Sequence, residues 1–127
     1  MTHETDAPVR VLVVEDSFPV ADSLRVFLES EGFQVKIVGN VRRAMAAADE
    51  GTFDVAVLDI LLGAESVAPV AARMESAGIP LIYLSGFGDA ELLPEALRAH
   101  PRLDKPCDPA LLVTTIREVL AAARRTH

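Results

Sequence analysis

Five short apolar runs alternate along the chain with segments whose apolar residues recur at helical spacing, and this alternation constrains the fold most. The runs lie at residues 9–14, Gln34–Val38, Val55–Asp59, 80–85 and Arg102–Asp104. Three of them are almost continuously apolar, which is typical of strands buried on both faces. A fivefold alternation of strands and helices with short connections predicts an α/β domain with a parallel sheet covered on both sides.

The helical segments carry recognisable start signals. Asn40 is expected to cap the second helix, Ser66 the third, and Asp108, followed by Pro109, the last. Glycines and a proline interrupt the segment before the fifth run, so only a short helix at residues 94–99 is expected there.

Composition narrows the classes of function. A chain of 127 residues is the size of one domain, so we expect a single domain over residues 1–127 with an ordered core at about 9–124. The formal net charge of −7 argues against direct binding to DNA or RNA, whose phosphates would repel it. The one cysteine, Cys107, excludes an internal disulfide and a cysteine metal cluster. No signal region or membrane-spanning stretch is recognisable, so we expect a soluble cytoplasmic protein without membrane insertion.

Polar residues follow four of the five predicted strands. Glu15 and Asp16 come directly after the first, Asp59 closes the third, Ser85 closes the fourth, and Lys105 follows the fifth. In a parallel sheet these ends lie at one edge, where ligands bind in doubly wound folds. The sequence therefore predicts that three carboxylates, a hydroxyl and an amine converge there.

This set of side chains suits phosphoryl chemistry. Three neighbouring carboxylates repel one another unless a cation joins them, and Mg²⁺ prefers such oxygen ligands. Asp59 is the predicted nucleophile because the end of a strand holds it rigidly in the centre. Lys105 and Ser85 are expected to hold the remaining phosphoryl oxygens during in-line transfer.

The order of an acid pair, an aspartate, a Ser/Thr and Lys-Pro, each at its own strand end, resembles the receiver domain of two-component response regulators. The resemblance implies that Asp59 is the phosphorylated aspartate and that Glu15 and Asp16 bind the metal. It likewise implies that Ser85 is the switch hydroxyl and that Lys105 senses the phosphoryl group.

Further expectations come from the same family. Its sheet has the flavodoxin-like strand order 2-1-3-4-5, and its metal also takes a backbone carbonyl, here that of Leu61. The proline after the lysine, here Pro106, is often preceded by a cis peptide bond.

One departure from the family pattern concerns switching. Receivers usually carry an aromatic residue three positions before the lysine, where this chain has Arg102. The stretch PLIYLSGFG is similar to the motif Pro-Phe-x-Phe-Ala-Thr-Gly of the FAT-GUY receivers, which also lack that aromatic residue and often occur as stand-alone domains in alphaproteobacterial stress signalling.

The resemblance implies a stand-alone response regulator. Such a protein takes a phosphoryl group from a sensor histidine kinase or a histidine phosphotransfer protein and signals by altered binding to a downstream protein, or serves as a phosphate relay or sink. The exposed face of Phe18–Ser30 would be the docking surface for the kinase.

Two alternatives stay open. One is an interaction module with the receiver fold that is never phosphorylated; the intact acids and Lys105 argue against it. The other is a Mg²⁺-dependent phosphohydrolase of the haloacid-dehalogenase type, which carries Asp-x-Asp after an early strand, whereas Ile60 and Leu61 follow Asp59. We therefore expect no enzyme beyond a domain that catalyses its own phosphorylation and dephosphorylation.

Overall fold

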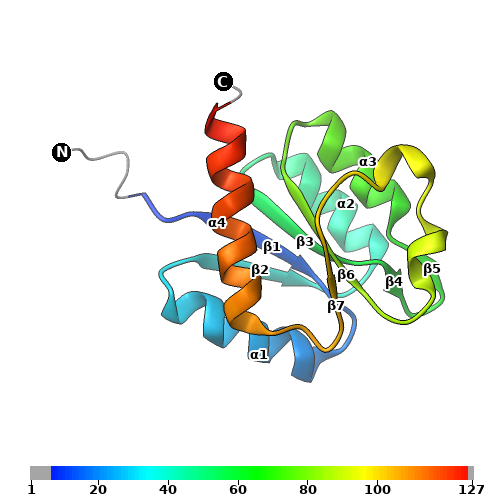
Figure 1. Cartoon of the computed structure of the whole chain (residues 1–127), viewed down its shortest axis with the longest axis horizontal. Helices are drawn as coiled ribbons and strands as arrows, with labels where there is room; N and C mark the ends of the chain where they lie inside the picture. The colour runs from blue at the N-terminus through cyan, green and yellow to red at the C-terminus, as the bar shows by residue number, and fades with distance from the viewer. Residues whose placement is uncertain (1–6, 126–127) are drawn as a thin grey trace.

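One parallel sheet organises the molecule. The computed structural model describes residues 7–125, so the predicted loose ends fall largely outside the described residues. The strands of the main sheet lie in the order β2-β1-β3-β6-β7, which is the predicted order 2-1-3-4-5 (Figure 1). They are β1 (Arg10–Val14), β2 (Gln34–Val38), β3 (Val55–Asp59), β6 (Leu81–Ser85) and β7 (Arg102–Asp104). Every neighbouring pair is parallel, so all five carboxyl ends meet at one edge.

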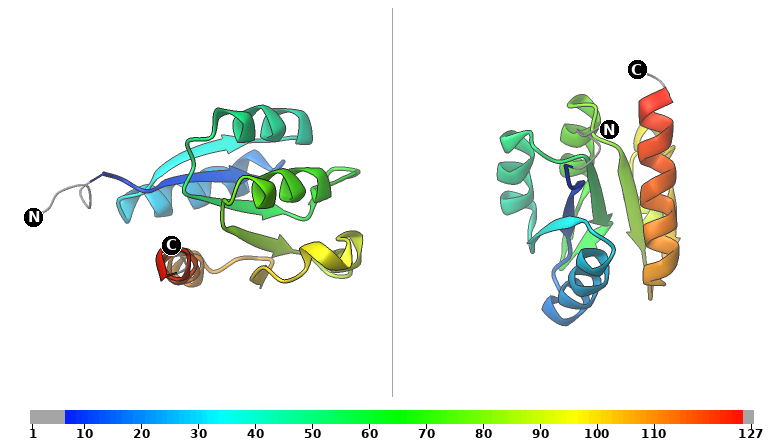
Figure 2. Two further views of the ribbon diagram at one scale, coloured as in Figure 1. Left: turned by 90° about the horizontal axis from the view of Figure 1, so that it is seen from above. Right: turned by 90° about the vertical axis from the view of Figure 1, so that its left-hand side faces the viewer.

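Helices cover both faces of this sheet (Figure 2). One face packs against α1 (Phe18–Ser30) and α4 (Pro109–Arg125), and the other against α2 (Val41–Glu50) and α3 (Ala68–Ser76). Successive side chains of a strand point to opposite faces of the sheet. Val13 therefore belongs to the apolar core on the side of α1 and α4, and its neighbour Leu12 to the core on the side of α2 and α3. Both side chains are fully buried, as the continuous apolar runs predict.

The capping signals read from the sequence are confirmed at two helices and displaced by one residue at a third. The Asn40 side chain accepts a hydrogen bond from the backbone N–H of Arg43 at 2.8 Å. The Asp108 side chain accepts one from the N–H of Ala110 at 3.0 Å. The Ser66 hydroxyl accepts from the N–H of Ala68 at 3.1 Å, although the N-cap position itself is Val67.

The segment between β6 and β7 differs from the prediction. In place of a short α-helix at residues 94–99, it forms two 3₁₀ turns, η2 (Asp89–Leu92) and η3 (Glu95–Leu97). Pro94 precedes the second turn and has no N–H to continue a helix. The Arg98 side chain then closes the segment by donating to the carbonyl of Leu93 at 2.8 Å.

A small hairpin follows β3 that the sequence pattern did not predict. It consists of β4 (Leu61–Leu62) and β5 (Glu65–Ser66), which pair antiparallel. Gly63 turns the chain between them with a φ of 61°, a conformation that favours glycine. The hairpin lies directly beyond Asp59 and therefore borders the carboxyl edge of the sheet.

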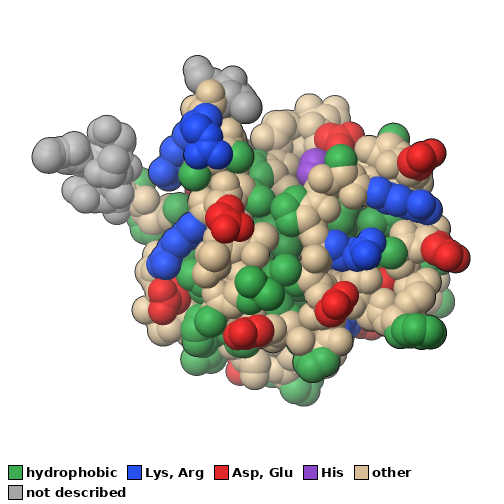
Figure 3. Space-filling view, viewed as in Figure 1, with side chains coloured by type: hydrophobic (Ala, Val, Ile, Leu, Met, Phe, Trp, Pro, Cys, Tyr) green, Lys and Arg blue, Asp and Glu red, His purple; other side chains and the backbone are tan. Residues whose placement is uncertain are grey.

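Charged side chains of both signs are interspersed with apolar ones on the face that carries α4 and β7 (Figure 3). The most exposed large apolar side chains are Phe87, at 109% of the reference exposure, and Phe18, at 71%. Within residues 7–125, no helix has both the length and the apolar character that crossing a membrane requires.

Candidate functional site

Three carboxylates meet at the carboxyl edge of the sheet, as the sequence predicts. Glu15 follows β1 and Asp59 ends β3, and each exposes at most 2% of its surface, whereas Asp16 is exposed. One carboxylate oxygen from each of the three lies within 4.8 Å of the others. Neighbouring strands hold Glu15 and Asp59 rigidly, so the cluster is built into the sheet.

Lys105 supplies a positive charge to this cluster. Its Nζ donates a hydrogen bond to Asp59 Oδ2 at 2.9 Å and lies 3.7 Å from Glu15 Oε1. Burial opposes the charge on Lys105, but the bond to Asp59 and the surrounding carboxylates outweigh it and raise the lysine pKa. The peptide bond from Lys105 to Pro106 is cis, as is common in the family the chain resembles.

Two buried oxygens of the cluster have unused acceptor capacity. Asp59 Oδ1 and Glu15 Oε1 have no hydrogen-bond partner within residues 7–125. Such groups are costly unless something pairs with them. Burial, together with the charge of Asp59, raises the pKa of Glu15 to about 7, although the N–H of Ser17 and Lys105 act in the opposite direction. A hard divalent cation with oxygen ligands fits this set of donors.

Asp16 ties the hairpin to the carboxylate cluster. Its Oδ2 accepts a hydrogen bond from the backbone N–H of Gly63 at 2.9 Å, a contact that the sequence did not indicate. Leu61 begins β4 two residues beyond Asp59, so its backbone borders the cluster. That its carbonyl binds a metal stays a prediction.

Ser85 ends β6 at the same edge, but its hydroxyl is engaged elsewhere. Ser85 Oγ donates to Asp89 Oδ1 at 2.7 Å, and the N–H of Gly86 donates to Asp89 Oδ2, also at 2.7 Å. Sequence reasoning missed Asp89. The available signal was an acid four residues after the hydroxyl, beyond two glycines that allow the chain to turn back.

The residues near the expected switch differ in their exposure to solvent. Tyr83 is buried, and its hydroxyl donates to the carbonyl of Leu97 at 2.8 Å. Arg102, in the position of the usual aromatic residue, pairs with Tyr83 in the sheet and is exposed. Phe87 projects fully into solvent, so it does not cover the core.

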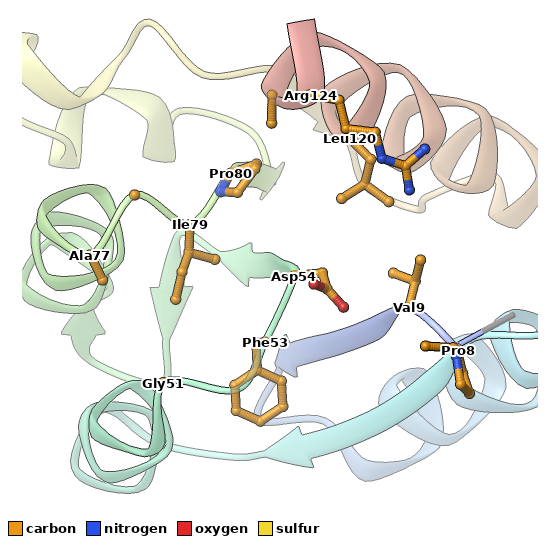
Figure 4. Close-up of a pocket in the computed structure, with 13 residues that line it drawn as sticks. Pro8, Val9, Gly51, Phe53, Asp54, Ala77, Ile79, Pro80, Leu120 and Arg124 are labelled. Carbon is orange, nitrogen blue, oxygen red and sulfur yellow. The ribbon is translucent and has the colours of Figure 1, made fainter. Parts of the chain in front are cut away.

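Two hollows lie at opposite edges of the sheet. A cavity of about 490 Å³ at the amino-terminal edge is bordered by Val9, Asp54 and Leu120 and contains none of the predicted site residues (Figure 4). An apolar groove of about 640 Å³ lies beside Lys105, between Val20 of α1 and Pro106. Of the two, only the groove is lined by a predicted site residue, Lys105.

A parallel five-stranded sheet with a buried, lysine-paired aspartate at its carboxyl edge is typical of the phosphoacceptor domains of two-component signalling. The chain belongs to the response regulator receiver domain family, which matches residues 11–117. It is 31% identical over 114 residues to the sensory transduction protein RegX3 of Mycolicibacterium smegmatis. It is 29% identical over 111 residues to the DNA-binding response regulator MtrA of Mycobacterium tuberculosis.

These alignments cover most of the chain but only part of each relative. They include 87% of the chain and 50% of RegX3, and 85% of the chain and 49% of MtrA. The chain therefore spans about half the length of the curated relatives it matches.

Solved receiver structures share the whole fold. The CheY-like receiver domain protein from Methanospirillum hungatei superposes with a TM-score of 0.85 at 23% identity, covering 95% of this chain and 100% of that one. The signal receiver domain of a modulated diguanylate cyclase from Desulfovibrio desulfuricans gives 0.84 at 30% identity, with the same coverage. The FAT-GUY subclass stays a prediction.

Proposed function

We propose that the chain accepts a phosphoryl group on Asp59 from the phosphohistidine of a sensor histidine kinase or a histidine phosphotransfer protein. The observation that carries this proposal is the state of the Asp59 carboxylate. Lys105 holds one of its oxygens at 2.9 Å, and the other is buried and accepts no hydrogen bond from residues 7–125. A buried carboxylate with one positioned oxygen and one available oxygen is suited to nucleophilic attack.

The transfer is a single in-line displacement. A carboxylate oxygen of Asp59 attacks phosphorus, the bond between phosphorus and the histidine nitrogen breaks, and the electron pair returns to the imidazole ring. The product is an acyl phosphate on Asp59. Lys105, already hydrogen-bonded to this carboxylate, is placed to pair with a phosphoryl oxygen.

Glu15, Asp16 and Asp59, with the backbone carbonyl of Leu61, would hold Mg²⁺. When bound, the ion supplies positive charge that neutralises phosphoryl oxygens during transfer. Glu15 Oε1 accepts no hydrogen bond from residues 7–125, and the pKa of Glu15 is raised. Both features support this assignment, because they disfavour the cluster without a cation. Ser85 would bind a further phosphoryl oxygen once its hydroxyl is released from Asp89.

The apolar groove beside Lys105 supports a docking site for the phosphodonor protein. It lies between the first turn of α1 and the loop after β7, and it is lined by Pro19, Val20 and Pro109 among others. Phe18 adjoins it with 71% of its surface exposed. A donor helix packed there would bring a phosphohistidine close to Asp59.

The output follows from what the phosphorylated domain presents. We propose a cytoplasmic regulator that alters its binding to a downstream protein, or relays or drains phosphate. Its net charge of −7 disfavours direct contact with nucleic acid, and the name DNA-binding belongs to relatives about half of whose length the chain matches.

The test is the intact mass of the protein after incubation with acetyl phosphate, with and without Mg²⁺. Wild type should gain one phosphoryl group only with Mg²⁺, and Asp59→Asn should gain none. Asp54→Asn, directly before the start of the same strand, is the matched control and should behave like wild type. Uptake by Asp59→Asn, or none by wild type in the presence of Mg²⁺, would contradict the proposal and favour a receiver-like interaction module.

A further inference from the structure

Asp89 is a buried carboxylate that the proposed transfer chemistry does not use. It begins η2 and exposes 9% of its surface. Both of its oxygens are occupied at 2.7 Å, one by the hydroxyl of Ser85 and the other by the backbone N–H of Gly86. Bonds to a charged acceptor are the stronger kind of protein hydrogen bond, so this contact fixes the loop that follows β6.

The backbone of residues 85–89 is shaped for this contact. Gly88 has a φ of 79°, which glycine adopts readily and which turns the chain back toward β6. A Cβ at Gly86 would lie 3.3 Å from Asp89 Oδ2, so a larger residue there would crowd the carboxylate. The two glycines of this loop thus allow Asp89 to reach both of its donors.

We infer that Asp89 is a latch: a positioning residue that holds the Ser85 hydroxyl away from the phosphoryl site until phosphorylation displaces it. The inference rests on the proposed function of Ser85. A serine hydroxyl has one proton to donate, so it cannot serve Asp89 and a phosphoryl oxygen together. Asp89 and the phosphoryl group therefore compete for the same donor.

This competition has a consequence for the neighbouring surface. Phe87 lies in the loop between Gly86 and Asp89 and is fully exposed. Because the hydrogen bonds of Asp89 hold this loop, release of the latch moves the Phe87 side chain. The apparent affinity for a phosphoryl group is reduced by the fraction of molecules in which Ser85 is free. Asp89 thereby sets how much phosphorylation is needed to change the surface that carries Phe87.

The test is calorimetric titration of the full chain with beryllofluoride, a noncovalent phosphoryl analogue, at saturating Mg²⁺. Asp89→Asn, which cannot accept both hydrogen bonds as the carboxylate does, should bind roughly threefold more tightly than wild type, and Asp89→Ala about tenfold more tightly. A residue that served only to stabilise the fold would give the opposite sign. Unchanged or weaker binding by both variants would overturn the latch.

Two controls separate the latch from a general effect of charge. Glu91→Gln removes the same charge from the exposed side of η2 and should leave the affinity within about twofold of wild type. In a Ser85→Ala background, where no hydroxyl remains to be released, Asp89→Asn should change the affinity less than about twofold. Equal tightening in that background would overturn the latch.

The same titration distinguishes the two proposals. If wild type binds beryllofluoride and the Asp89 variants bind no more tightly, the latch fails while phosphorylation of Asp59 stands. If wild type neither binds the analogue nor gains a phosphoryl group from acetyl phosphate, the proposed function fails and the latch with it.

Discussion

Two aspartates flank the same strand, and their surroundings are opposite. Asp54 directly precedes β3 and is exposed, and its Oδ2 accepts a hydrogen bond from the backbone N–H of Arg10 at 2.8 Å. Asp59 ends β3 and is buried. It is bonded to Lys105, and its second oxygen has no hydrogen-bond partner in the described part of the chain. Asp54 therefore has a structural role before the start of the strand, whereas Asp59 at its end has a carboxylate oxygen available for chemistry.

The difference follows from the direction of the sheet. At the amino-terminal edge, the one hydrogen bond that the Asp54 side chain accepts within residues 7–125 comes from the backbone N–H of Arg10 in the neighbouring β1. At the carboxyl edge, Asp59 lies close to Glu15, Asp16 and Lys105. These three residues directly follow the carboxyl ends of β1 and β7. Parallel strands thus concentrate charge at one edge, which is where ligands bind in such sheets.

The largest contrast is expected in Mg²⁺ affinity. Asp59→Asn removes a carboxylate ligand and should weaken Mg²⁺ binding about a hundredfold, because Mg²⁺ depends on charged oxygen ligands. Asp54→Asn should leave it within about twofold, because that carboxylate lies at the other edge. Isothermal titration of both variants measures the difference. Equal losses would show that Asp59 is not a ligand.

Removal of Lys105 should act in the opposite direction. Lys105→Met takes a positive charge from beside Asp59 and Glu15, so Mg²⁺ should bind about tenfold more tightly. In the absence of metal the variant should unfold at a lower denaturant concentration, because the buried carboxylates lose their counter-charge. Lys36→Met, whose exposed ammonium pairs with Glu50, is the control and should change neither quantity appreciably. Weaker Mg²⁺ binding by Lys105→Met would contradict the assignment.

Glu15 should make Mg²⁺ binding depend on pH. Its pKa of about 7 in the metal-free protein lies above its ordinary value, so a proton competes with the cation. Affinity should fall roughly threefold when the pH drops from about 7.5 to about 6.5. Glu15→Gln should bind more weakly and lose most of this dependence over the same range. A wild-type affinity that is flat across it would refute the role of Glu15.

The same raised pKa fixes the sign of the pH effect on metal-free stability. The folded state retains the Glu15 proton more strongly than the unfolded state does. The stabilisation is therefore fully present below the ordinary value of 4.5 and is lost as the pH rises through about 7. Saturating Mg²⁺ should oppose this loss, which denaturation with and without the ion can measure.

The smallest effect is expected at Asp54. Asp54→Ala removes one exposed hydrogen bond to the Arg10 N–H and should cost about 1 kcal/mol or less of unfolding free energy. Urea denaturation measures this change, and phosphoryl uptake should remain at the wild-type level. A loss of uptake without unfolding would break the contrast between the two ends of the strand.

The sequence predicted the sheet and the convergence of its polar residues because both depend on simple periodicity. Apolar runs such as Val55–Asp59 marked the strands, and parallel direction placed Glu15 and Lys105 beside Asp59. The β4–β5 hairpin was missed because two-residue strands have no periodicity to detect. The 3₁₀ turns replaced the predicted helix because proline and local hydrogen bonding decide such short segments.

The state of Ser85 could not be predicted from the sequence. Its position at a strand end indicated a role at the site, but a hydroxyl can donate to any acceptor that the backbone brings near. Only the positive φ of Gly88 and the resulting return of the chain bring Asp89 within 2.7 Å. The residue that engages the hydroxyl was therefore visible only in three dimensions.

The most direct test of the account is to locate the phosphoryl group itself. Wild-type protein phosphorylated in the presence of Mg²⁺ would be reduced with borohydride, which converts an aspartyl phosphate to homoserine, and its peptides sequenced by mass spectrometry. The account predicts homoserine at position 59, with aspartate retained at positions 54 and 89. Homoserine at another carboxylate, with position 59 unchanged, would contradict it.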